Sequence, residues 1–385
     1  MTELPSEHLH EPVDFARPDH DESDVEAVAR VLRSGWLTTG TEAEAFEAEL
    51  SEFLGGPEVV STSSCTAALE IALASLALEP GARVGVPTWT FPASALAAVR
   101  AGADVVLLDV EPTTLNLSSE SLEAAFAEGL DAVVGVHFGG VPLPAEVREF
   151  CDSAGVPLVE DAAHAFGATD DRGPVGGAGR FTCFSFYATK NLTSGEGGAL
   201  ATTDPEVASF ARCYRLHGLG EGSVDRYRPG SLDTPDVAVP GIKGNLPDVL
   251  AALGRSQLAR FSALQARRRH AAVRYRERLG DVEDLEVVPA DACVGSADHL
   301  LVVLLPEGTD RSHVRMQLSE RGIGSSVHFP PLHRLSWFHD HAAVGPSGVA
   351  GAESMADRVL SLPLHPGLTD GDVDRVVDVL VEDLP

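Results

Sequence analysis

Residues 132–161 read AVVGVHFGGVPLPAEVREFCDSAGVPLVED, and this stretch decides the fold class. A short apolar run opens it at 132–138 and a second one closes it at 156–161. Between them, residues 144–155 have the pattern of a helix. A strand, a helix and a strand at this spacing predict a mostly parallel sheet with helices on both of its faces.

The same alternation continues on both sides of this stretch. Short apolar runs bounded by turn residues predict strands at 59–62, 83–87, 103–110, 181–188 and 197–203. Helical patterns cover 22–35, 44–55, 66–78 and 118–129. Only the segment TKNLTSGE separates the last two predicted strands. We therefore expect an α/β protein built on one large sheet.

The character of the chain changes after Pro247. An arginine-rich helix is predicted over 256–279, and a strand, a helix and a closing helix follow it at 299–306, 311–322 and 370–380. We therefore predict a large domain over residues 1–250, with a loose N-terminal arm, and a smaller α+β domain over residues 251–385. The run Arg267–Arg269 could bind a polyanion, but the solvated face of the linking helix is the simpler interpretation.

Acidic residues outnumber basic ones by a wide margin. The 385 residues include 58 Asp and Glu against 28 Lys and Arg, which gives a formal net charge of −30. This charge argues against non-specific binding to nucleic acid or to anionic membrane surfaces, because both require a basic surface. An anionic ligand must therefore be held by locally focused groups.

The sequence also bears on the compartment. No apolar stretch is long enough to span a bilayer, and the acidic N-terminus lacks the pattern of a signal peptide. The five cysteines, Cys65, Cys151, Cys183, Cys213 and Cys293, form no CxxC pair. An odd number without paired spacing argues against a disulfide framework or a zinc ribbon, so we expect a cytoplasmic protein.

Lysine is almost absent from this chain. Lys190 and Lys243 are the only lysines, and every other basic residue is an arginine. A GC-rich genome can produce such a bias. Where arginine serves most charged roles, however, a retained lysine indicates a task that arginine cannot perform. The main such task is a titratable amine that forms a Schiff base.

Three features together predict a cofactor site. Asp161 ends a predicted strand at the edge where open α/β sheets bind ligands, although taken alone it favours a helix cap. Ser64, Cys65 and Thr66 lie where a strand is followed by a helix. The N–H groups at the start of that helix could bind an anion, or a hydroxyl of this segment could simply cap the helix. Lys190 lies on a tight Gly-rich connection. A phosphate cup, a strand-end carboxylate and a buried lysine are what pyridoxal phosphate requires.

Eight motifs, in this order along essentially the whole chain, resemble those of the DegT/DnrJ/EryC1/StrS aminotransferases, which act mostly on nucleotide-linked keto-sugars. They are GWLTTG (35–40), SSCTAAL (63–69), PTWTFPASA (87–95), VEDAAHAFGA (159–168), FSFYATKNLTSGEGG (184–198), GIKGNLPD (241–248), GIGSSVHFPPLH (322–333) and LPLHPGLTDGDVDRV (362–376). The resemblance implies the PLP-dependent transferase fold type I of the aspartate aminotransferase superfamily. It also implies pyridoxal 5'-phosphate as the cofactor and a homodimer whose active sites lie at the interface.

The resemblance also assigns residues around the ring of the cofactor. It implies that Lys190 forms the Schiff base and that Asp161 pairs with the protonated pyridine nitrogen. His164 stands where the family has Gln or His beside the phenolic oxygen, and Phe91 matches the aromatic residue that stacks on the ring.

A second group of residues is expected to bind the phosphate of the cofactor. The resemblance implies that Ser64, Cys65, Thr66 and Ser185 hold it. Cys65 departs from the family, which commonly has Gly or Ala at this position. Because the backbone N–H of Cys65 can still serve, we expect little effect of this change.

Further matching residues lie farther along the chain. Lys243 and Asn245 retain a Lys/Asn version of the segment that reaches the phosphate of the neighbouring subunit, although Gly244 replaces the usual aromatic. His328 and His333 match a substrate-side segment, and Thr38 of GWLTTG is a further candidate for substrate binding.

Histidine pairs raise the question of a metal. A metal at His328 and His333, or at His339 and His341, is disfavoured, because neither pair carries a carboxylate shell.

The function implied by the resemblance is the transfer of an amino group from L-glutamate or L-glutamine to a keto-sugar. The acceptor would be a nucleotide-linked 4-keto- or 3-keto-6-deoxy sugar, in the biosynthesis of amino sugars or antibiotics. A ketocyclitol acceptor and a non-catalytic regulatory protein on the same scaffold remain as alternatives. No GxGxxG follows a strand, which disfavours a NAD-dependent enzyme, and Lys190 disfavours the dehydratase branch of the family, which has histidine there.

Overall fold

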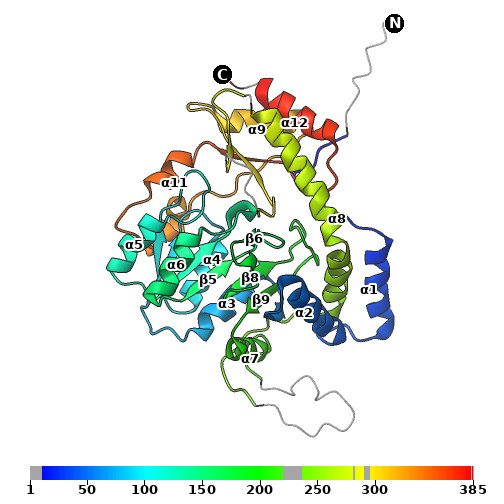
Figure 1. The fold of residues 1–385 in the computed structure, drawn as a ribbon, viewed down its shortest axis with the longest axis vertical. Helices are drawn as coiled ribbons and strands as arrows, with labels where there is room; N and C mark the ends of the chain where they lie inside the picture. The colour runs from blue at the N-terminus through cyan, green and yellow to red at the C-terminus, as the bar shows by residue number, and fades with distance from the viewer. Residues whose placement is uncertain (1–10, 220–235, 281, 290–294, 383, 385) are drawn as a thin grey trace.

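A computed structural model describes residues 11–219, 236–280, 282–289, 295–382 and 384. Figure 1 shows a large α/β part and a smaller part that carries α9 and α12, with the long helix α8 (Asp248–Leu279) running between them. The helix crosses residue 250, the predicted domain boundary, without a break. It contacts α1 and α2 with its first half and α12 with its second half.

The large sheet has eight strands, and seven of them run in the same direction. In spatial order they are β1 (Glu58–Thr62), β9 (Gly198–Thr202), β8 (Thr182–Ser185), β5 (Leu158–Asp161), β4 (Ala132–Val136), β2 (Arg83–Pro87), β3 (Asp104–Leu108) and β12 (Ala343–Val344). Only β9 is antiparallel to its neighbours β1 and β8. The short connection between β8 and β9 explains this direction, because a parallel pair needs a much longer crossover. The predicted mostly parallel sheet is confirmed.

Helices cover both faces of the sheet, as the sequence predicts. Val105 and Leu107 of β3 belong to the core formed with α3 and α4, whereas Val106 and Leu108 belong to the core formed with α5 and α6. This alternation is the two-residue period of a strand that is buried on both sides. The helices of the large part are α1 (Glu22–Ser34), α2 (Thr41–Leu54), α3 (Cys65–Ser75), α4 (Pro92–Arg100), α5 (Ser119–Ala127), α6 (Ala145–Ala154) and α7 (Pro205–Tyr214).

The C-terminal part has a core of its own. Its antiparallel sheet contains β10 (Glu286–Val288), β11 (Leu301–Leu304) and β13 (Val359–Leu362). The second half of α8 packs on this sheet together with α9 (Arg311–Glu320) and α12 (Asp370–Glu382). The remaining short elements are the β6–β7 hairpin (Thr169–Asp170 and Gly173–Pro174), the 3-10 turns Phe138–Gly140 and Leu332–Arg334, and α10 (Ser336–His341) and α11 (Ala350–Met355).

Several elements of the fold were not predicted from the sequence, and two of them show why. Helix α4 is rich in alanine, and small side chains give a weak periodic signal, so the segment after β2 showed no clear helix. The second feature is β12, a two-residue strand from the C-terminal part that pairs with β3 at the edge of the large sheet. Its length gives no pattern that a sequence could reveal.

The interpretation of Arg267–Arg269 as a solvated face is wrong for its central residue. The Arg268 side chain is buried, and its guanidinium donates to the carbonyl oxygens of Leu364 (2.7 Å) and His299 (3.5 Å). Arg267 is half exposed and pairs with Asp19 of the N-terminal arm at 2.9 Å. The run therefore joins the helix to other parts of the chain, because three consecutive residues of a helix point in different directions.

The cysteines and the helices bear on two sequence predictions, the absence of a disulfide framework and the absence of a membrane-spanning segment. Cys65, Cys151, Cys183 and Cys213 are free thiols, and Cys293 lies outside the described residues. Within the described part of the chain, no helix combines the length and the apolar character needed to cross a membrane.

Candidate active site

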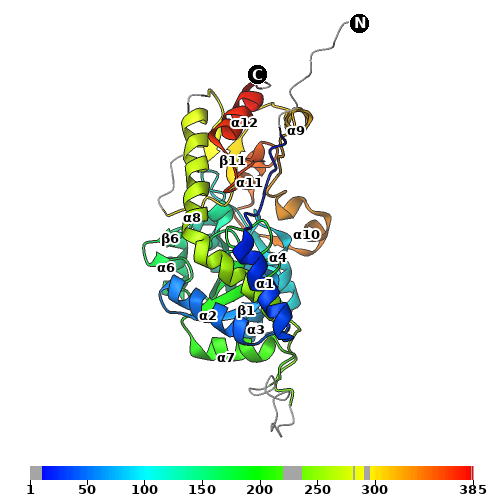
Figure 2. The same ribbon diagram turned by 90° about the vertical axis from the view of Figure 1, so that its right-hand side faces the viewer.

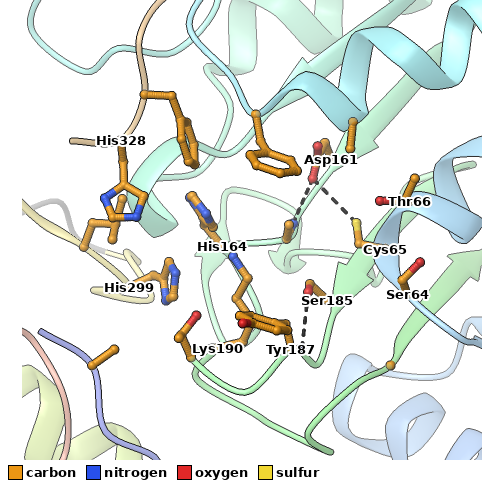
Figure 3. Close-up of a pocket in the computed structure, with 18 of the residues that line it drawn as sticks. Ser64, Cys65, Thr66, Asp161, His164, Ser185, Tyr187, Lys190, His299 and His328 are labelled. Atoms are coloured by element: carbon orange, nitrogen blue, oxygen red, sulfur yellow. Dashed lines mark hydrogen bonds between the residues drawn. The ribbon is translucent and has the colours of Figure 1, made fainter. Parts of the chain in front are cut away.

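A cavity of about 380 Å³ lies at the carboxyl end of β5, between the two parts of the molecule. Its size is typical of a small-molecule site. Figure 3 shows Asp161, Cys65, Ser64, Thr66 and Ser185 on one side of Lys190, and His328 and His299 on the other. The residues that line it include Phe15, Ser64, Cys65, Thr66, Phe91, Asp161, His164, Ser185, Tyr187, Lys190, His299, His328 and Phe329.

Asp161 lies at the end of β5 and is almost completely buried. The Ser94 hydroxyl donates to Oδ2 at 2.7 Å, the Ala163 N–H donates to Oδ1 at 3.1 Å, and the Cys65 thiol lies 3.7 Å from Oδ1. The bond to Ala163 belongs to a turn, and no described helix begins directly after β5. The helix-cap interpretation of Asp161 is therefore wrong. Hydrogen bonds fix the carboxylate at the base of the cavity instead.

Lys190 lies on the connection between β8 and β9, as predicted. Its backbone N–H donates to the Tyr187 carbonyl at 2.9 Å, which makes the connection a tight turn. No described residue accepts a hydrogen bond from its Nζ, so the amine is free within the cavity. Burial lowers the pKa of Lys190 to about 8, and the opposite charge of Asp161 limits this decrease. A larger fraction of this amine is unprotonated near neutral pH than in an ordinary lysine.

The segment Ser64–Thr66 forms the N-terminus of α3. The cap interpretation is confirmed for Ser64, and the anion-binding interpretation stays a prediction. The Ser64 hydroxyl accepts the N–H of Ala67 at 3.1 Å and so caps the helix. Ser64, Cys65 and Thr66 also line the cavity, where the helix end favours an anion. Gly198 permits this arrangement, because a Cβ at that position would lie 2.4 Å from the Ser64 carbonyl carbon. The segment GEGG (195–198) thus allows the backbone at Gly198 to lie close to the N-terminus of α3.

His164 presents a hydrogen-bond donor to the cavity. The Gly139 N–H donates to its Nδ1 at 3.3 Å, so the proton of a neutral ring sits on Nε2. Burial and the nearby charge of Lys190 hold the pKa of His164 well below its ordinary value, which keeps the ring neutral. A neutral Nε2–H suits the phenolic oxygen that the resemblance places beside this residue.

A second histidine supports His164 from the C-terminal part of the chain. The rings of His299 and His164 lie 4.4 Å apart between centroids. His299 Nδ1 donates to the Asn191 side-chain oxygen at 2.8 Å, and the Asn191 amide donates to the Ala297 carbonyl at 2.6 Å. Asn191 follows Lys190 directly, so this network ties the lysine turn to the C-terminal part. Burial also holds the pKa of His299 well below its ordinary value.

The other candidates on the cavity wall are Phe91, Ser185 and Cys65. The Phe91 ring is 56% exposed and lies 5.6 Å from that of Phe329, so one of its faces is available to a ligand. The Ser185 hydroxyl accepts a hydrogen bond from the backbone N–H of Tyr187 at 3.3 Å. Burial raises the pKa of the Cys65 thiol well above its ordinary value. Cys65 therefore remains an uncharged neighbour of Asp161.

Four predicted residues do not line this cavity. The Lys243 ammonium donates to the Asn245 side-chain oxygen, and the Asn245 amide donates to the Thr39 hydroxyl at 2.5 Å. Thr38 is exposed on the neighbouring segment. The His333 ring contacts the Thr88 hydroxyl and the Glu353 carboxylate, each at 2.6 Å. These four residues remain predictions, and no metal-binding cluster is present among the residues that the structure describes.

Sequence reasoning missed four residues that support or line the site. Ser94 holds Asp161, Asn191 and His299 support the lysine turn and His164, and Phe15 of the N-terminal arm lines the cavity. Ser94 lies within the motif PTWTFPASA and could have been considered. Asn191 and His299 are 108 positions apart, and only the tertiary structure brings them together.

The residues present fit pyridoxal phosphate. The free amine of Lys190, the anchored carboxylate of Asp161 and the N-terminus of α3 lie around one cavity. They match in turn the aldehyde, the ring nitrogen and the phosphate of this cofactor. The neutral donor of His164 and the exposed face of Phe91 complete the match.

Comparison with known proteins gives the same result over most of the chain. The model of the DegT/DnrJ/EryC1/StrS aminotransferase family matches residues 18–381. The spore coat polysaccharide biosynthesis protein SpsC of Bacillus subtilis (strain 168) is 36% identical over 371 residues, which cover 95% of each chain.

Solved structures extend the comparison. The putative sugar aminotransferase Spr1654 from Streptococcus pneumoniae, in its PMP form, has a TM-score of 0.88 at 29% identity, over 96% of this chain and 98% of that one. The aminotransferase TlmJ from Streptoalloteichus hindustanus has a TM-score of 0.86 at 33% identity, over 97% and 98% of the two chains. The predicted fold class is confirmed.

Proposed function

The chain belongs to the DegT/DnrJ/EryC1/StrS aminotransferase family, and we propose that it transfers an amino group from L-glutamate or L-glutamine to a nucleotide-linked keto-deoxyhexose. The enzyme is an aminotransferase and its cofactor is pyridoxal 5'-phosphate. The observation that carries the proposal is the unpaired amine of Lys190, in one cavity with the anchored Asp161 and the N-terminus of α3. A non-catalytic protein on this scaffold would not need that complete set.

When bound, the cofactor supplies an electron sink for the electrons released at a substrate C–H bond. The protein supplies the groups that bind, orient and move protons. Asp161 carries the negative charge that favours a proton on the ring nitrogen, and Ser94 and Ala163 hold its carboxylate in place. Nζ of Lys190, with a pKa of about 8, both accepts and donates a proton near neutral pH. His164 Nε2 donates a hydrogen bond without adding a charge.

The character of the cavity supports a sugar acceptor. His164, His299 and His328 all have pKa values held below the ordinary value by burial, that of His328 at about 4. Neutral imidazoles donate and accept hydrogen bonds, as sugar hydroxyl groups require. Phe15, Phe91 and Phe329 line the same cavity and offer apolar ring faces to C–H groups. The similar protein Spr1654 is described as a putative sugar aminotransferase, which supports the same acceptor class.

A panel of amino acceptors tests this function. We expect the holoenzyme, converted to its amino form by L-glutamate or L-glutamine, to return to its starting absorption spectrum with a nucleotide-linked 4-keto- or 3-keto-6-deoxyhexose. The panel should include thymidine-, uridine- and guanosine-diphosphate sugars, a ketocyclitol and simple α-keto acids. Turnover of the ketocyclitol alone would replace the acceptor, and turnover of none would favour a non-catalytic protein.

We further propose that the enzyme is a homodimer in which Lys243 and Asn245 hold the phosphate in the partner's site. Neither residue lines the cavity of its own chain, although both belong to a family motif. Asn245 binds Thr39 in the segment that also carries Trp36 and Leu37, whose side chains are 39% and 47% exposed. Apolar groups exposed beside a lysine suit a subunit interface. A chain of net charge −30 also gains a cation at a phosphate site from its partner.

Subunit mixing tests the shared site. A Lys190→Ala chain and a Lys243→Ala/Asn245→Ala chain should each be impaired alone. In a mixed dimer, one site combines an intact Lys190 with an intact Lys243 and Asn245, while the other carries every lesion. Mixing should therefore restore up to about half of the site activity per mixed dimer, by symmetry.

A matched control separates this outcome from general stabilisation. Lys190→Ala mixed with Asp161→Asn should give no rescue, because both residues line the same cavity and each site retains one lesion. Failure of the first pair to complement, after subunit exchange is verified by mass spectrometry, would contradict the shared site. An active monomer in sedimentation would contradict it as well.

A further inference from the structure

The N-terminal arm forms part of the cavity wall. Residues 11–20 precede α1 and run in an extended path along the C-terminal part (Figure 2). Val13 forms a parallel bridge to Ile323, donating to the Gly322 carbonyl and accepting from the Gly324 N–H, each at 2.9 Å. Two residues later, Phe15 enters the lining of the cavity. The backbone of the arm is thus anchored directly beside this side chain.

Phe15 stacks on a histidine of the substrate side. Its ring lies 5.3 Å from the His328 ring, at an interplanar angle of 20°. His328 is also in edge contact with Phe329, which in turn lies 5.6 Å from Phe91. An aromatic row on the cavity wall therefore leads from Phe91 through Phe329 and His328 to Phe15. His328 lies across Lys190 from the N-terminus of α3 (Figure 3), and Phe15 stacks on this histidine.

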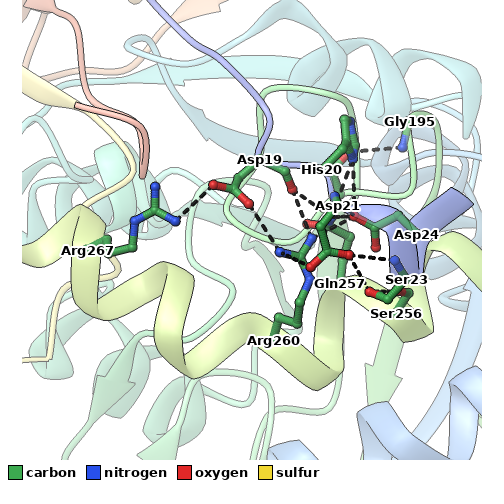
Figure 4. A network of polar contacts seen from close by, with 11 residues as sticks. Asp19, His20, Asp21, Ser23, Asp24, Gly195, Ser256, Gln257, Arg260 and Arg267 are labelled. Atoms are coloured by element: carbon green, nitrogen blue, oxygen red, sulfur yellow. Dashed lines mark hydrogen bonds and ion pairs between the residues drawn. The ribbon is translucent and has the colours of Figure 1, made fainter. Parts of the chain in front are cut away.

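Ionic contacts to α8 hold the other end of the arm (Figure 4). The Asp19 carboxylate accepts from Arg260 at 3.1 Å and from Arg267 at 2.9 Å. The Gln257 amide donates to the Asp19 backbone carbonyl at 2.9 Å. Asp24, at the start of α1, accepts from the same Arg260 at 2.6 Å. Charge-assisted bonds from two arginines to one carboxylate fix both its position and its direction.

We propose that Phe15 is a specificity-determining residue for the amino acceptor, and that Asp19 is the positioning residue that holds the Phe15 segment against the cavity. The proposal rests on the proposed function, since it assigns a role toward the larger of the two substrates. It concerns a part of the chain that none of the eight motifs includes.

The two substrates differ in size, and therefore in how many residues of the cavity they can contact. Both substrates would place their reacting carbon near Lys190, but an amino acid donor is small and extends little beyond that carbon. A sugar acceptor linked to a nucleotide is larger and must extend beyond the first layer of side chains. Phe15 lines the cavity in stacking contact with His328, where the part of the larger substrate beyond its reacting carbon can contact it. Its ring face offers apolar contact to a sugar or a stacking surface to a base.

Half-reaction kinetics test the role of Phe15. The probe is the keto-sugar nucleotide that the wild-type holoenzyme turns over best in the acceptor panel. Phe15→Ala should raise KM for this acceptor about 10- to 100-fold, the range for losing a buried aromatic contact. The rate at which L-glutamate or L-glutamine converts the cofactor should stay within about twofold. Phe15→Tyr, which keeps the ring, should restore most of the acceptor affinity.

Hydrogen exchange tests the role of Asp19 without relying on turnover. Asp19→Asn keeps the shape of the side chain but removes its charge, so the arm should open more often. The amide of Val13, which bonds to Gly322, should exchange about tenfold faster, and KM for the acceptor should rise with it. Asp374→Asn is the matched control. Asp374 pairs with two arginines of the same helix, Arg274 and Arg278, each at 2.7 Å and at similar exposure, and among the described residues its side chain makes no hydrogen bond or ion pair to the arm. Asp374→Asn should leave both quantities unchanged.

The outcomes distinguish this proposal from the function on which it rests. Wild-type turnover of a keto-sugar together with unchanged acceptor KM in Phe15→Ala would overturn the role of Phe15 and leave the function intact. Equal effects on both half-reactions would also overturn it, since they would indicate a structural role. Exchange at Val13 that is unaffected by Asp19→Asn would overturn the role of Asp19. Absence of turnover with any keto-sugar would overturn the function and, with it, the assignment of Phe15 to that acceptor.

Discussion

Lys190→Ala is expected to abolish transamination while leaving the protein folded and able to bind its cofactor. Among the described residues, Lys190 is the only titratable amine that lines the cavity, and we propose that it moves protons at the substrate carbon. Rates should fall by about 10⁴-fold or more, since nucleophilic and proton-transfer roles are lost together. Single-turnover absorbance measurements with L-glutamate or L-glutamine would record the loss. Wild-type rates in this variant would contradict the assignment of Lys190.

The chain offers a sharp control for this prediction. It contains only two lysines, so borohydride reduction of the holoenzyme followed by peptide mapping gives an unambiguous answer. The cofactor should be fixed on Lys190 in the wild type and on neither lysine in the variant. Lys190→Arg should be as inactive as the alanine variant, because a guanidinium keeps the charge but does not titrate near neutral pH. A cofactor adduct on Lys243 would overturn the assignment.

Asp161→Asn is expected to reduce the rate by about 10³-fold with little change in stability. The physical reason is charge, because a neutral amide does not favour a proton on the ring nitrogen of the cofactor. The asparagine side chain has nearly the same shape and retains one oxygen for the donors around it, which are the Ser94 hydroxyl and the Ala163 N–H. The melting temperature and the rate of the donor half-reaction should be measured on the same preparation.

A residue that does cap a helix provides the comparison. Asp204 caps α7, where it accepts the Glu206 N–H at 2.9 Å, and it lies away from the cavity. Asp204→Asn or Asp204→Ala should cost at most about 1 kcal/mol of stability and leave the rate normal. If Asp161→Asn behaved like these variants, the catalytic role of Asp161 would be wrong.

Much of the fold could be predicted because it depends on local patterns. The valine-rich runs and the helical spacing of residues 132–161 fix two parallel strands and their helix, and the remaining repeats of this pattern fix the class. The helix predicted over 22–35 matches α1, which Asp21 caps at its start and which ends at Gly35 with a φ of 78°. Helix α4 was not predicted because its alanines give little periodic pattern of hydrophobicity. Strand β12 was not predicted because a segment of two residues gives no such pattern.

The candidate site also has features that could be predicted from the sequence and features that could not. Ser64 and Thr66, Asp161 and Lys190 each lie at the end of a predicted strand or in a predicted connection, and a parallel sheet brings such ends to one edge. Their approach could therefore be predicted. Whether Asp161 capped a helix or faced a ligand could not be, because both roles place an acidic residue after a strand. The turn at Ala163 and the Ser94 hydroxyl decided it.

The sequence by itself determined the fold class and the family motifs, and it indicated the two groups that we propose carry the chemistry, Lys190 and Asp161. These depend on residue type and on distances along the chain, which a sequence states directly. Only the tertiary structure decided which residues support them: the bond of His299 to Asn191, the burial of Arg268, and the anchoring of Asp19 that brings Phe15 to the cavity. Each of these contacts joins segments far apart in the chain. Their formation depends on how the C-terminal part packs on the large sheet, and no local pattern encodes that packing.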